Sequence, residues 1–382
     1  MFSRLTARIL AACLVAAGAA AALPWMNVWM SAEAAPAAAT RMSFSDIDGW
    51  ARDDQSAALA AFRRSCARIV NLPPAAPLDT KSSDTFHGRA GDWQPACHAA
   101  ALVAPGANNA RGFFQHWFVP VKYADEQGLF TGYYEPEMKG ALTRGGVYQT
   151  PVLRAPPGFR MVAGGGSFPA RAAIEDGALD TEKLALVWLE SPIDAFFLHV
   201  QGSGRVKLET GETVRLSFAA KTGHPYTSIG KLLIDRGELT RETVSMQTIR
   251  AWLLAHPADG RALMRQNQSY IFFRILRNVK PDAGPPGAEG VNLTPGRSLA
   301  VDRAYHPLGT LLWLTTAHPT VDGSGSVPFA RLMVAQDAGS AIKGRQRADI
   351  FFGAGTDAGE IAGRMKADGE LIALVPKDIA PR

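Results

Sequence analysis

The sequence predicts a mainly β protein with flanking helices, and three observations carry that prediction. The 382 residues are 47% hydrophobic, enough for two compact domains that each have a core. The 37 glycines and 25 prolines stand among short apolar runs, which favours strands joined by turns over a helical bundle. Near residue 128 the pattern changes from helical spacing to short extended runs.

The first 34 residues have the layout of a secretory signal peptide. Arg4 and Arg8 precede an apolar run from Ile9 to Leu23, and the small residues around Ala34 suit cleavage. The run is shorter than the roughly 20 residues that a spanning helix needs. The sequence before Cys13 also spells a lipoprotein cleavage site, although few apolar residues precede it. We therefore expect export, with an uncleaved or lipid-modified anchor as the alternative.

Helical spacing predicts three helices that pack together before residue 128. Apolar residues from Leu59 to Ile69 recur at steps of three and four, in a helix that Asp53 or Asp54 can cap. Shorter segments around Trp93 and from Phe113 to Trp117 predict the other two.

Two cysteines remain once a signal peptide is removed, Cys66 in the first of these helices and Cys97 in the second. In an exported protein such a pair predicts a disulfide, and two separate buried thiols are the alternative. Neither has a second Cys or His at ligand spacing, so the sequence predicts no metal site there.

From residue 128 onward the sequence alternates short extended runs with turns. Glycines at 202–204 and 209–212 predict hairpin turns. The predicted strands are 128–135, 148–153, 184–189, 196–201, 205–208, 213–218, 270–276, 299–302, 309–314, 332–336, 349–352 and 371–375. The predicted helices are 228–236, 245–255 and 357–366.

Charge and motif patterns argue against several functions. The net charge is +5, but no run of five basic residues occurs, which disfavours a nucleic-acid arm and suits an anionic polymer. The eight histidines are scattered, and His199 in an apolar run is more typical of a core histidine than of a base. The glycines from 353 to 359 lack the following strand and acidic residue of a dinucleotide site. We expect no cofactor.

Carboxylates beside glycine turns are the candidates for chemistry. Asp302, Asp337 and Asp349 all adjoin predicted strands in the final third of the chain. Three cations stand in the loop between the last two: Lys343, Arg345 and Arg347. If the aspartates converge in one barrel, burial and a neighbouring carboxylate raise a carboxyl pKa above its usual value of about 4, which makes a proton donor feasible. The competing interpretation is that each aspartate only accepts loop amides.

Aromatic residues beside an acid form a second candidate region, from Thr131 to Glu135. Tyrosine rings on a groove commonly seat sugar faces, and Tyr133 and Tyr134 are adjacent here. Tyrosines on strands are also common core residues, so both interpretations stay open.

Four blocks of this sequence, in order, resemble the membrane-bound lytic murein transglycosylase A family. They are GLFTGYYEPEMKG from Gly128, LVWLESPIDAFFLHVQGSGRVKL from Leu186, SLAVDRAYHPLGT from Ser298 and LMVAQDAGSAIKGRQRADIFFG from Leu332. The resemblance implies a six-stranded double-psi β-barrel built from residues 43–134 and 270–382. It also implies a smaller β domain inserted at residues 135–269, with a groove between the two that holds the glycan.

The resemblance also implies an activity. The expected enzyme is a peptidoglycan lytic exotransglycosylase that cleaves the β-1,4 bond between N-acetylmuramic acid and N-acetylglucosamine without water and leaves 1,6-anhydro ends. Asp349 acts as acid and then base, supported by Asp337 and more weakly by Asp302. The expected substrate-binding residues are Thr131, Tyr133, Tyr134, Gln201, Ser203 and Lys343.

The resemblance further implies a periplasmic protein, associated with the outer membrane, whose partner is the peptidoglycan glycan strand. We expect a monomer without a nucleic-acid partner. Two alternatives remain at this point: a hydrolytic glycosidase on the same barrel, and a peptidoglycan-binding module without turnover.

Overall fold

The computed structural model describes residues 39–82, 86–123 and 128–381. The predicted signal peptide and the lipoprotein motif at Cys13 lie outside the described residues. Across those three ranges, no helix combines the length and the apolarity that crossing a membrane would require.

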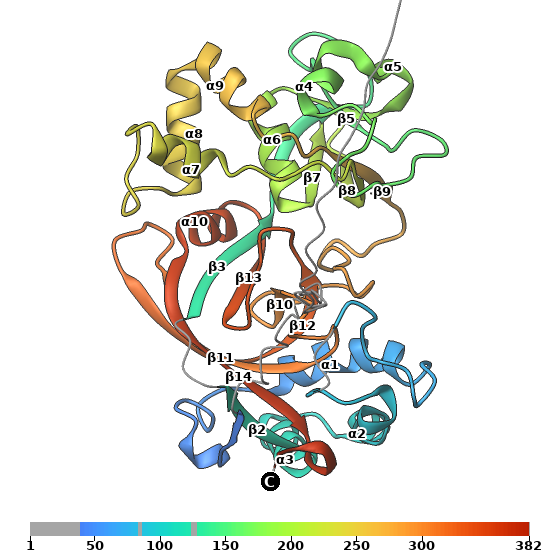
Figure 1. Cartoon of the computed structure of the whole chain (residues 1–382), viewed down its shortest axis with the longest axis vertical. Coiled ribbons are helices and arrows are strands. Elements are labelled where there is room, and N and C mark those ends of the chain that lie inside the picture. The colour runs from blue at the N-terminus through green and yellow to red at the C-terminus, as the bar shows by residue number, and fades with distance from the viewer. Residues whose placement is uncertain (1–38, 83–85, 124–127, 382) are drawn as a thin grey trace, which may run out of the picture. The chain divides into compact units, whose positions relative to one another are not determined.

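Six strands close into a barrel, in the order β14-β11-β12-β10-β13-β3, because β3 pairs back onto β14. They are β3 (Gly128–Glu135), β10 (Ser298–Val301), β11 (Leu311–Pro319), β12 (Ser326–Ala338), β13 (Arg347–Ala354) and β14 (Lys366–Pro376). Figure 1 shows β3 beside β13, its parallel partner. The closure confirms the predicted six-stranded barrel.

Two further strands extend the sheet beyond β14. One half of β14 pairs with β3 and the other half with β2 (Phe118–Tyr123), which in turn pairs with β1 (Ala39–Arg41). The stretch from Ser43 to about Gln127 was predicted to be helical, and for β2 that prediction was wrong. The run FVPVKY is short and almost entirely buried, and periodicity cannot separate such a strand from a buried helix segment.

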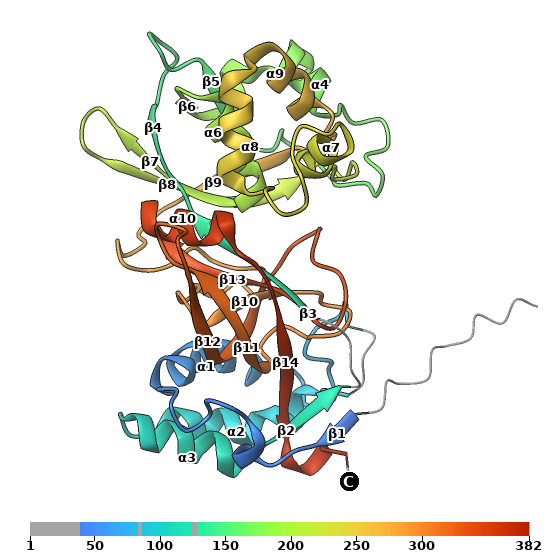
Figure 2. The same cartoon turned by 90° about the vertical axis from the view of Figure 1, so that its left-hand side faces the viewer.

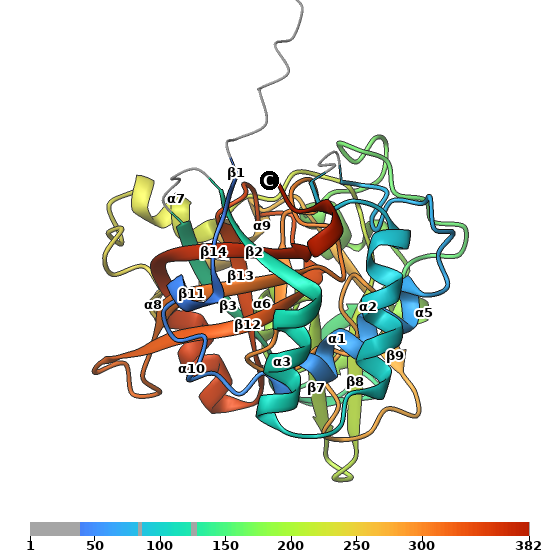
Figure 3. The same ribbon diagram turned by 90° about the horizontal axis from the view of Figure 1, so that it is seen from below.

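The first half of β11 (Leu311–Pro319) is apolar on both faces, because both faces are covered there. In β11, Leu312 and Leu314 belong to the barrel interior, whereas Leu311 and Trp313 pack outward against the N-terminal helices. Those helices are α1 (Ser56–Ile69), α2 (Ala90–Leu102) and α3 (Ala107–Trp117), seen together in Figure 3. Continuous apolar runs in the sequence are the consequence.

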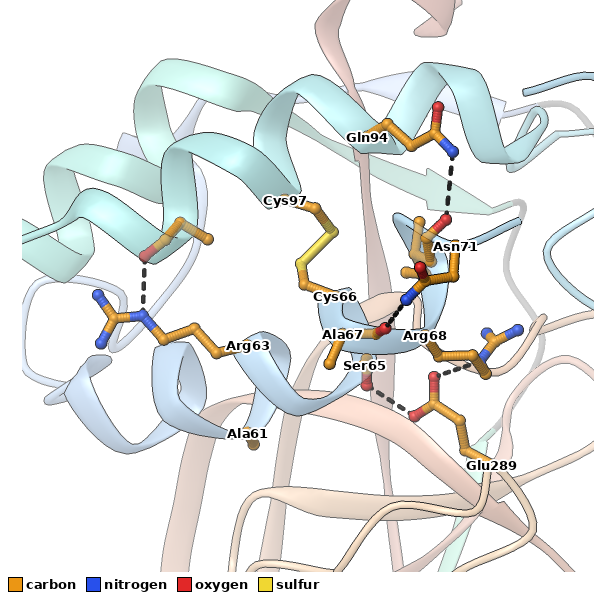
Figure 4. The surroundings of a disulfide bond; sticks show 12 residues. Ala61, Arg63, Ser65, Cys66, Ala67, Arg68, Asn71, Gln94, Cys97 and Glu289 are labelled. Atoms are coloured by element: carbon orange, nitrogen blue, oxygen red, sulfur yellow. Dashed lines mark hydrogen bonds and ion pairs between the residues drawn. A yellow bond between two sulfur atoms is a disulfide. The ribbon is translucent and has the colours of Figure 1, made fainter. Parts of the chain in front are cut away.

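Cys66 of α1 and Cys97 of α2, the predicted pair, form a disulfide with a Cα–Cα distance of 5.1 Å (Figure 4). At the start of α1, the Asp54 carboxylate accepts a hydrogen bond from the Ser56 amide at 2.9 Å. Asp53 does not cap the helix; it forms a buried ion pair with Arg297 at 2.7 Å.

A second, six-stranded sheet is inserted between β3 and β10, in the order β5-β6-β4-β7-β8-β9. Its strands are β4 (Glu137–Ala141), β5 (Thr150–Leu153), β6 (Ala185–Leu189), β7 (Ser203–Leu208), β8 (Thr213–Lys221) and β9 (Ile271–Leu276). Figure 2 shows β3 leading from the barrel towards β4. The predicted boundary at residue 270 puts Ile271–Leu276 with the barrel, whereas this strand pairs with β8 in the second sheet.

The remaining helices lie in the chain between strands of the second sheet, except for α10, which lies between β13 and β14 of the barrel. They are α4 (Arg171–Ala173), α5 (Thr181–Leu184), α6 (Pro192–Gln201), α7 (Ile229–Asp235), α8 (Met246–Ala255), α9 (Pro257–Arg265) and α10 (Thr356–Arg364). Single turns complete the order: η1 (Phe44–Asp46), η2 (Ile174–Ala178) and η3 (Lys377–Ile379).

Helix α6 corrects the predicted strand at 196–201 and places His199 in a helix. Ser191 caps α6 by accepting a hydrogen bond from the Asp194 amide at 3.2 Å, and Pro192 occupies its first turn. Gly202 ends the helix with a φ of 78°, a left-handed conformation that suits glycine. The helix is apolar on nearly all sides, which hides the helical period.

A buried carboxylate joins the barrel to the second sheet. Glu135, the last residue of β3, is fully buried between Arg205 of β7 at 2.8 Å and Arg215 of β8 at 2.9 Å. The amide of Arg205 also donates to the carbonyl of Pro136 at 2.8 Å. These bonds fix the end of the strand that crosses from one sheet to the other.

We expect Glu135→Gln to lower the free energy of unfolding by about 3–5 kcal/mol, because it leaves two arginines without their counter-ion. Glu137→Gln is the matched control, since the pair between Glu137 and Lys207 is largely exposed and such pairs contribute at most about 1 kcal/mol. Urea unfolding of both variants measures the difference. Equal losses in both variants would show that the buried Glu135 carboxylate contributes no more to the free energy of unfolding than the exposed Glu137 does.

Candidate active site

The pairing register brings two of the three predicted aspartates into one row. Asp349 of β13 lies opposite Ala300 of β10, and Ala300 lies opposite Asp337 of β12. On the other side, Asp349 lies opposite Thr131 of β3. Residues opposite one another in neighbouring strands project from the same face, so Thr131, Asp349, Ala300 and Asp337 line up across four strands.

This row lies on the outer face of the barrel. Ala348 and Ile350, which flank Asp349, belong to the interior cluster. Two strand spacings separate Asp337 from Asp349, which is about 10 Å between their Cα atoms. Ala300 lies between them in the row, and its side chain is a single methyl group.

A β-bulge in β12 aims Asp337 at this row. The register steps from Leu299 opposite Ala335 to Ala300 opposite Asp337, so Gln336 is the extra residue. Without the bulge, Gln336 would lie opposite Ala300 and Asp337 would take the alternate face. A bulge next to a candidate site commonly re-aims a side chain in this way.

Asp349 is held by two side chains and stays partly open to solvent. Its Oδ1 atom accepts hydrogen bonds from the hydroxyl of Thr131 and from the guanidinium of Arg347. Arg347 also donates to the Thr131 hydroxyl at 2.9 Å, which closes a triangle of the three side chains. About a fifth of the Asp349 side chain, 21%, is exposed.

Asp337 lies beside Tyr133 and, like Asp349, is partly exposed. Its Oδ1 atom accepts the amides of Ala288 and Ala338, each at 2.9 Å. Burial raises the pKa of the Asp337 carboxyl, the two amides oppose that shift, and the charge of Asp349 adds to it. Burial and the charge of Asp337 raise the pKa of the Tyr133 hydroxyl well above its usual range. The two carboxylates and this phenol therefore interact electrostatically.

Asp302 anchors the loop between β12 and β13. Its carboxylate accepts the amide of Gly344 at 3.0 Å and that of Ala304 at 3.2 Å. Gly344 has a φ of 108°, where a side chain would be strained. Lys343 lies 3.9 Å from Asp302 and its side chain is 73% exposed.

A cavity of about 810 Å³ opens beside the row and is lined by both sheets. Six of its lining residues were predicted for the site: Tyr133, Gln201, Ser203, Asp302, Asp337 and Lys343. Phe218, Arg274 and the loop 285–290 also line it and were not predicted.

The structure does not bring every predicted residue to the cavity wall. Thr131 and Asp349 are not among the lining residues and instead contact each other. Tyr134 faces α10, where an added side chain at Gly359 would meet its ring, and its amide donates to Gln201 Oε1 at 3.0 Å. The roles assigned to all these residues stay predictions.

Arg347, which contacts Asp349, was named among the loop cations but was not predicted as a site residue. It lies two residues before Asp349 in β13, and residues two apart in a strand share a face. That spacing is the signal that could have identified it. The amide of Ala288 has no comparable signal, because a distant loop supplies it.

The chain matches two family models and is similar to several solved structures. The family model described as "MltA specific insert domain" matches residues 129–274, and that described as "3D domain" matches residues 297–375. A crystal structure of a membrane-bound lytic murein transglycosylase from Agrobacterium tumefaciens is 35% identical, with a TM-score of 0.79. The match covers 89% of this chain and 98% of that one.

The chain belongs to the membrane-bound lytic murein transglycosylase A family. Escherichia coli MltA with bound chitohexaose is 33% identical, with a TM-score of 0.64, over 85% of this chain and 90% of that one. The curated E. coli membrane-bound lytic murein transglycosylase A is 43% identical over 249 residues. That match spans 63% of this chain and 64% of the relative's length.

The first of the two family models covers barrel strand β3 together with the second sheet, and the other covers the remaining five strands of the closed barrel. The insert model runs from β3 to β9, and the 3D model runs from just before β10 to the end of β14. All three candidate aspartates therefore lie within the 3D domain, and the glycan-binding candidates from Thr131 to Ser203 lie within the insert model.

We expect Asp337→Asn to stabilise the protein increasingly as pH rises from about 3 to about 7. Because the folded-state pKa of Asp337 is raised, the folded state binds more protons than the unfolded state in this window. Its free energy of unfolding therefore falls with pH, and the substitution removes that fall. Urea unfolding of wild type and variant at several pH values measures it.

Asp322→Asn is the control of opposite sign. Hydrogen bonds from Thr320 and Ser324 lower the pKa of Asp322 to about 2, so its carboxylate stabilises the fold at neutral pH and loses that effect in acid. Relative to wild type at the same pH, this variant is expected to become less stable as pH rises. If both variants show the same pH trend, the raised pKa of Asp337 is wrong.

Proposed function

We propose that the protein is a peptidoglycan lytic transglycosylase. Its reaction is cleavage of the β-1,4 bond between N-acetylmuramic acid and N-acetylglucosamine without water. Membership of the family supports this proposal, and so does the relative solved with chitohexaose. The observation that carries it is the partly exposed Asp349 carboxylate, held on the outer barrel face in a row with Asp337.

Asp349 is the acid and then the base. In the first step its carboxyl donates a proton to the glycosidic oxygen, and the bond from that oxygen to C1 of the muramoyl residue breaks. In the second step the carboxylate takes the proton of the muramoyl C6 hydroxyl, whose oxygen bonds to C1. The proton count balances, and the products are an anhydro end and a new 4-hydroxyl end.

One carboxyl suffices because the nucleophile belongs to the substrate. Ordinary glycosidases pair a general acid with a second carboxylate that activates water or attacks C1. Here no water needs activation, so one group can serve both proton transfers. Asp337 supports Asp349 through its charge, and Asp302 supports it through the loop that carries Lys343 and Arg347.

Arg347 and Thr131 orient Asp349 for both steps. Their hydrogen bonds to Oδ1 fix the carboxylate and leave Oδ2 for the sugar. Tyr133, Gln201, Ser203 and Lys343 line the cavity that would hold the glycan.

A hydrolytic glycosidase is the second candidate, and one observation favours it. Asp337 and Asp349 share a face at about 10 Å between Cα atoms, which is near the 6.5–9.5 Å between carboxyl groups of inverting enzymes. In that case Asp337 would activate water and the products would carry reducing ends.

We propose that the enzyme acts at the cell envelope, in the periplasm, because the curated relatives are named as membrane-bound.

We expect Asp349→Asn to lower the rate of glycan cleavage by about 10²–10⁴-fold, since it removes the only proposed proton carrier. The assay is release of soluble fragments from purified sacculi, with circular dichroism to show that the variant folds.

Asp322→Asn, at the exposed tip of the β11–β12 hairpin, is the control and is expected to keep wild-type activity. Near-normal cleavage by a folded Asp349→Asn variant would rule out the assignment of Asp349.

A further inference from the structure

We propose that Ser65 and Glu289 are positioning residues for Asp337, because they join helix α1 to the bulge and the loop that aim this carboxylate. The inference rests on the proposed function, in which Asp337 supports Asp349. It goes beyond that function by assigning a role to a helix that contributes no residue to the cavity wall.

The first contact between α1 and the site is with the bulge residue. Gln336 is fully buried, and its Nε2 atom donates to the carbonyl of Ala61 and to the hydroxyl of Ser65, both at 2.9 Å. Its Oε1 atom accepts from the hydroxyl of Ser298 at 2.6 Å. Helix α1 therefore holds the extra residue that turns Asp337 towards Ala300.

The second contact is with the loop 285–290. The Glu289 carboxylate, whose side chain is fully buried, accepts from the Ser65 hydroxyl at 2.6 Å and from Arg68 at 3.0 Å (Figure 4). The Glu289 amide donates to the carbonyl of Gln336 at 3.1 Å. One residue earlier in the same loop, the amide of Ala288 donates to Asp337.

The hydroxyl of Ser65 is the junction of the two contacts. It has one proton, which it donates to Glu289, and it accepts one from Gln336. The direction of every bond is thus fixed, from the Gln336 amide through Ser65 to the Glu289 carboxylate. A network in which each buried group is satisfied holds one geometry, whereas loss of one member leaves its neighbours unpaired.

The disulfide fixes the helix that presents this junction. Cys66 follows Ser65 in α1 and is bonded to Cys97 of α2, as Figure 4 shows. Arg68 strengthens the attachment, because it also donates to the carbonyls of Leu78 and Leu308, at 2.9 and 2.6 Å. The position of the Ala288 amide therefore depends on α1 as well as on its own loop.

The ionisable groups that act on Asp337 differ from those that act on Glu289. Tyr133 of β3 and Asp349 of β13 are the ionisable groups whose electrostatic effect on Asp337 is resolved. Arg68 and Asp79 are the corresponding groups for Glu289. Ser65→Ala changes no charge, so a shift of the Asp337 titration in that variant reports the Ala288 amide and the bulge.

The test is titration of Asp337 by carbon NMR of its carboxyl group, in wild type, Glu289→Gln and Ser65→Ala. Asp337→Asn assigns the resonance. A misplaced Ala288 amide no longer stabilises the carboxylate, so the Asp337 titration midpoint is expected to move to higher pH in both variants. We also expect kcat to fall about threefold to thirtyfold with KM changed less than about twofold.

Arg63→Met is the matched control. Arg63 lies on the same helix but donates to the carbonyls of Ala100 and Val103 in and after α2, at 2.7 and 2.6 Å. Its loss is expected to lower stability and to leave the Asp337 titration and kcat unchanged. A purely structural role for Ser65 and Glu289 predicts that they behave like this control.

The outcomes separate this inference from the proposed function. An unchanged Asp337 midpoint in folded Glu289→Gln and Ser65→Ala overturns the inference, even if Asp349→Asn is inactive. A shifted midpoint supports it, even if the wild-type products prove to be hydrolytic. If Glu289→Gln does not fold, Ser65→Ala alone decides, because it removes one hydroxyl and no charge.

Discussion

The register of β10 with its two neighbours is the constraint on which the candidate site depends. This four-residue strand pairs with β13 on one side and with β12 on the other, and Ala300 is the point where Asp349 and Asp337 meet in register. A slip of one residue on either side would send a carboxylate to the other face. The bulge at Gln336 is part of the same constraint, since it selects Asp337 for the row.

The strand β3 leads from the barrel into the second sheet. β3 presents Thr131 to Asp349, then Tyr133 to Asp337, and finally Glu135 to two arginines of the second sheet. Thr131, Tyr133 and Glu135 alternate along β3 and interact in turn with Asp349, with Asp337 and with the second sheet. A displaced Glu135 would shift the whole face, so stability and geometry are linked along this strand.

Much of the fold could be predicted from the sequence, and the failures have physical causes. Alternation and glycine turns indicated most strands, and the resemblance supplied the closure that spacing cannot show. The strand predicted at 196–201 failed because α6 is apolar on nearly all sides. The aspartates were identifiable from their places beside strands. The bulge, the Ala288 amide and the network through Ser65 could not be predicted, since each arises from segments far apart in the chain.

The central claim is that the substrate supplies its own nucleophile, and solvent labelling tests it most directly. Sacculi digested by the wild-type protein in water enriched in oxygen-18 give fragments whose masses show whether solvent entered the new end. The account predicts anhydro ends without label, one water lighter than hydrolytic ends. Fragments that carry one labelled oxygen at the cleaved muramoyl residue would contradict it and identify a hydrolase.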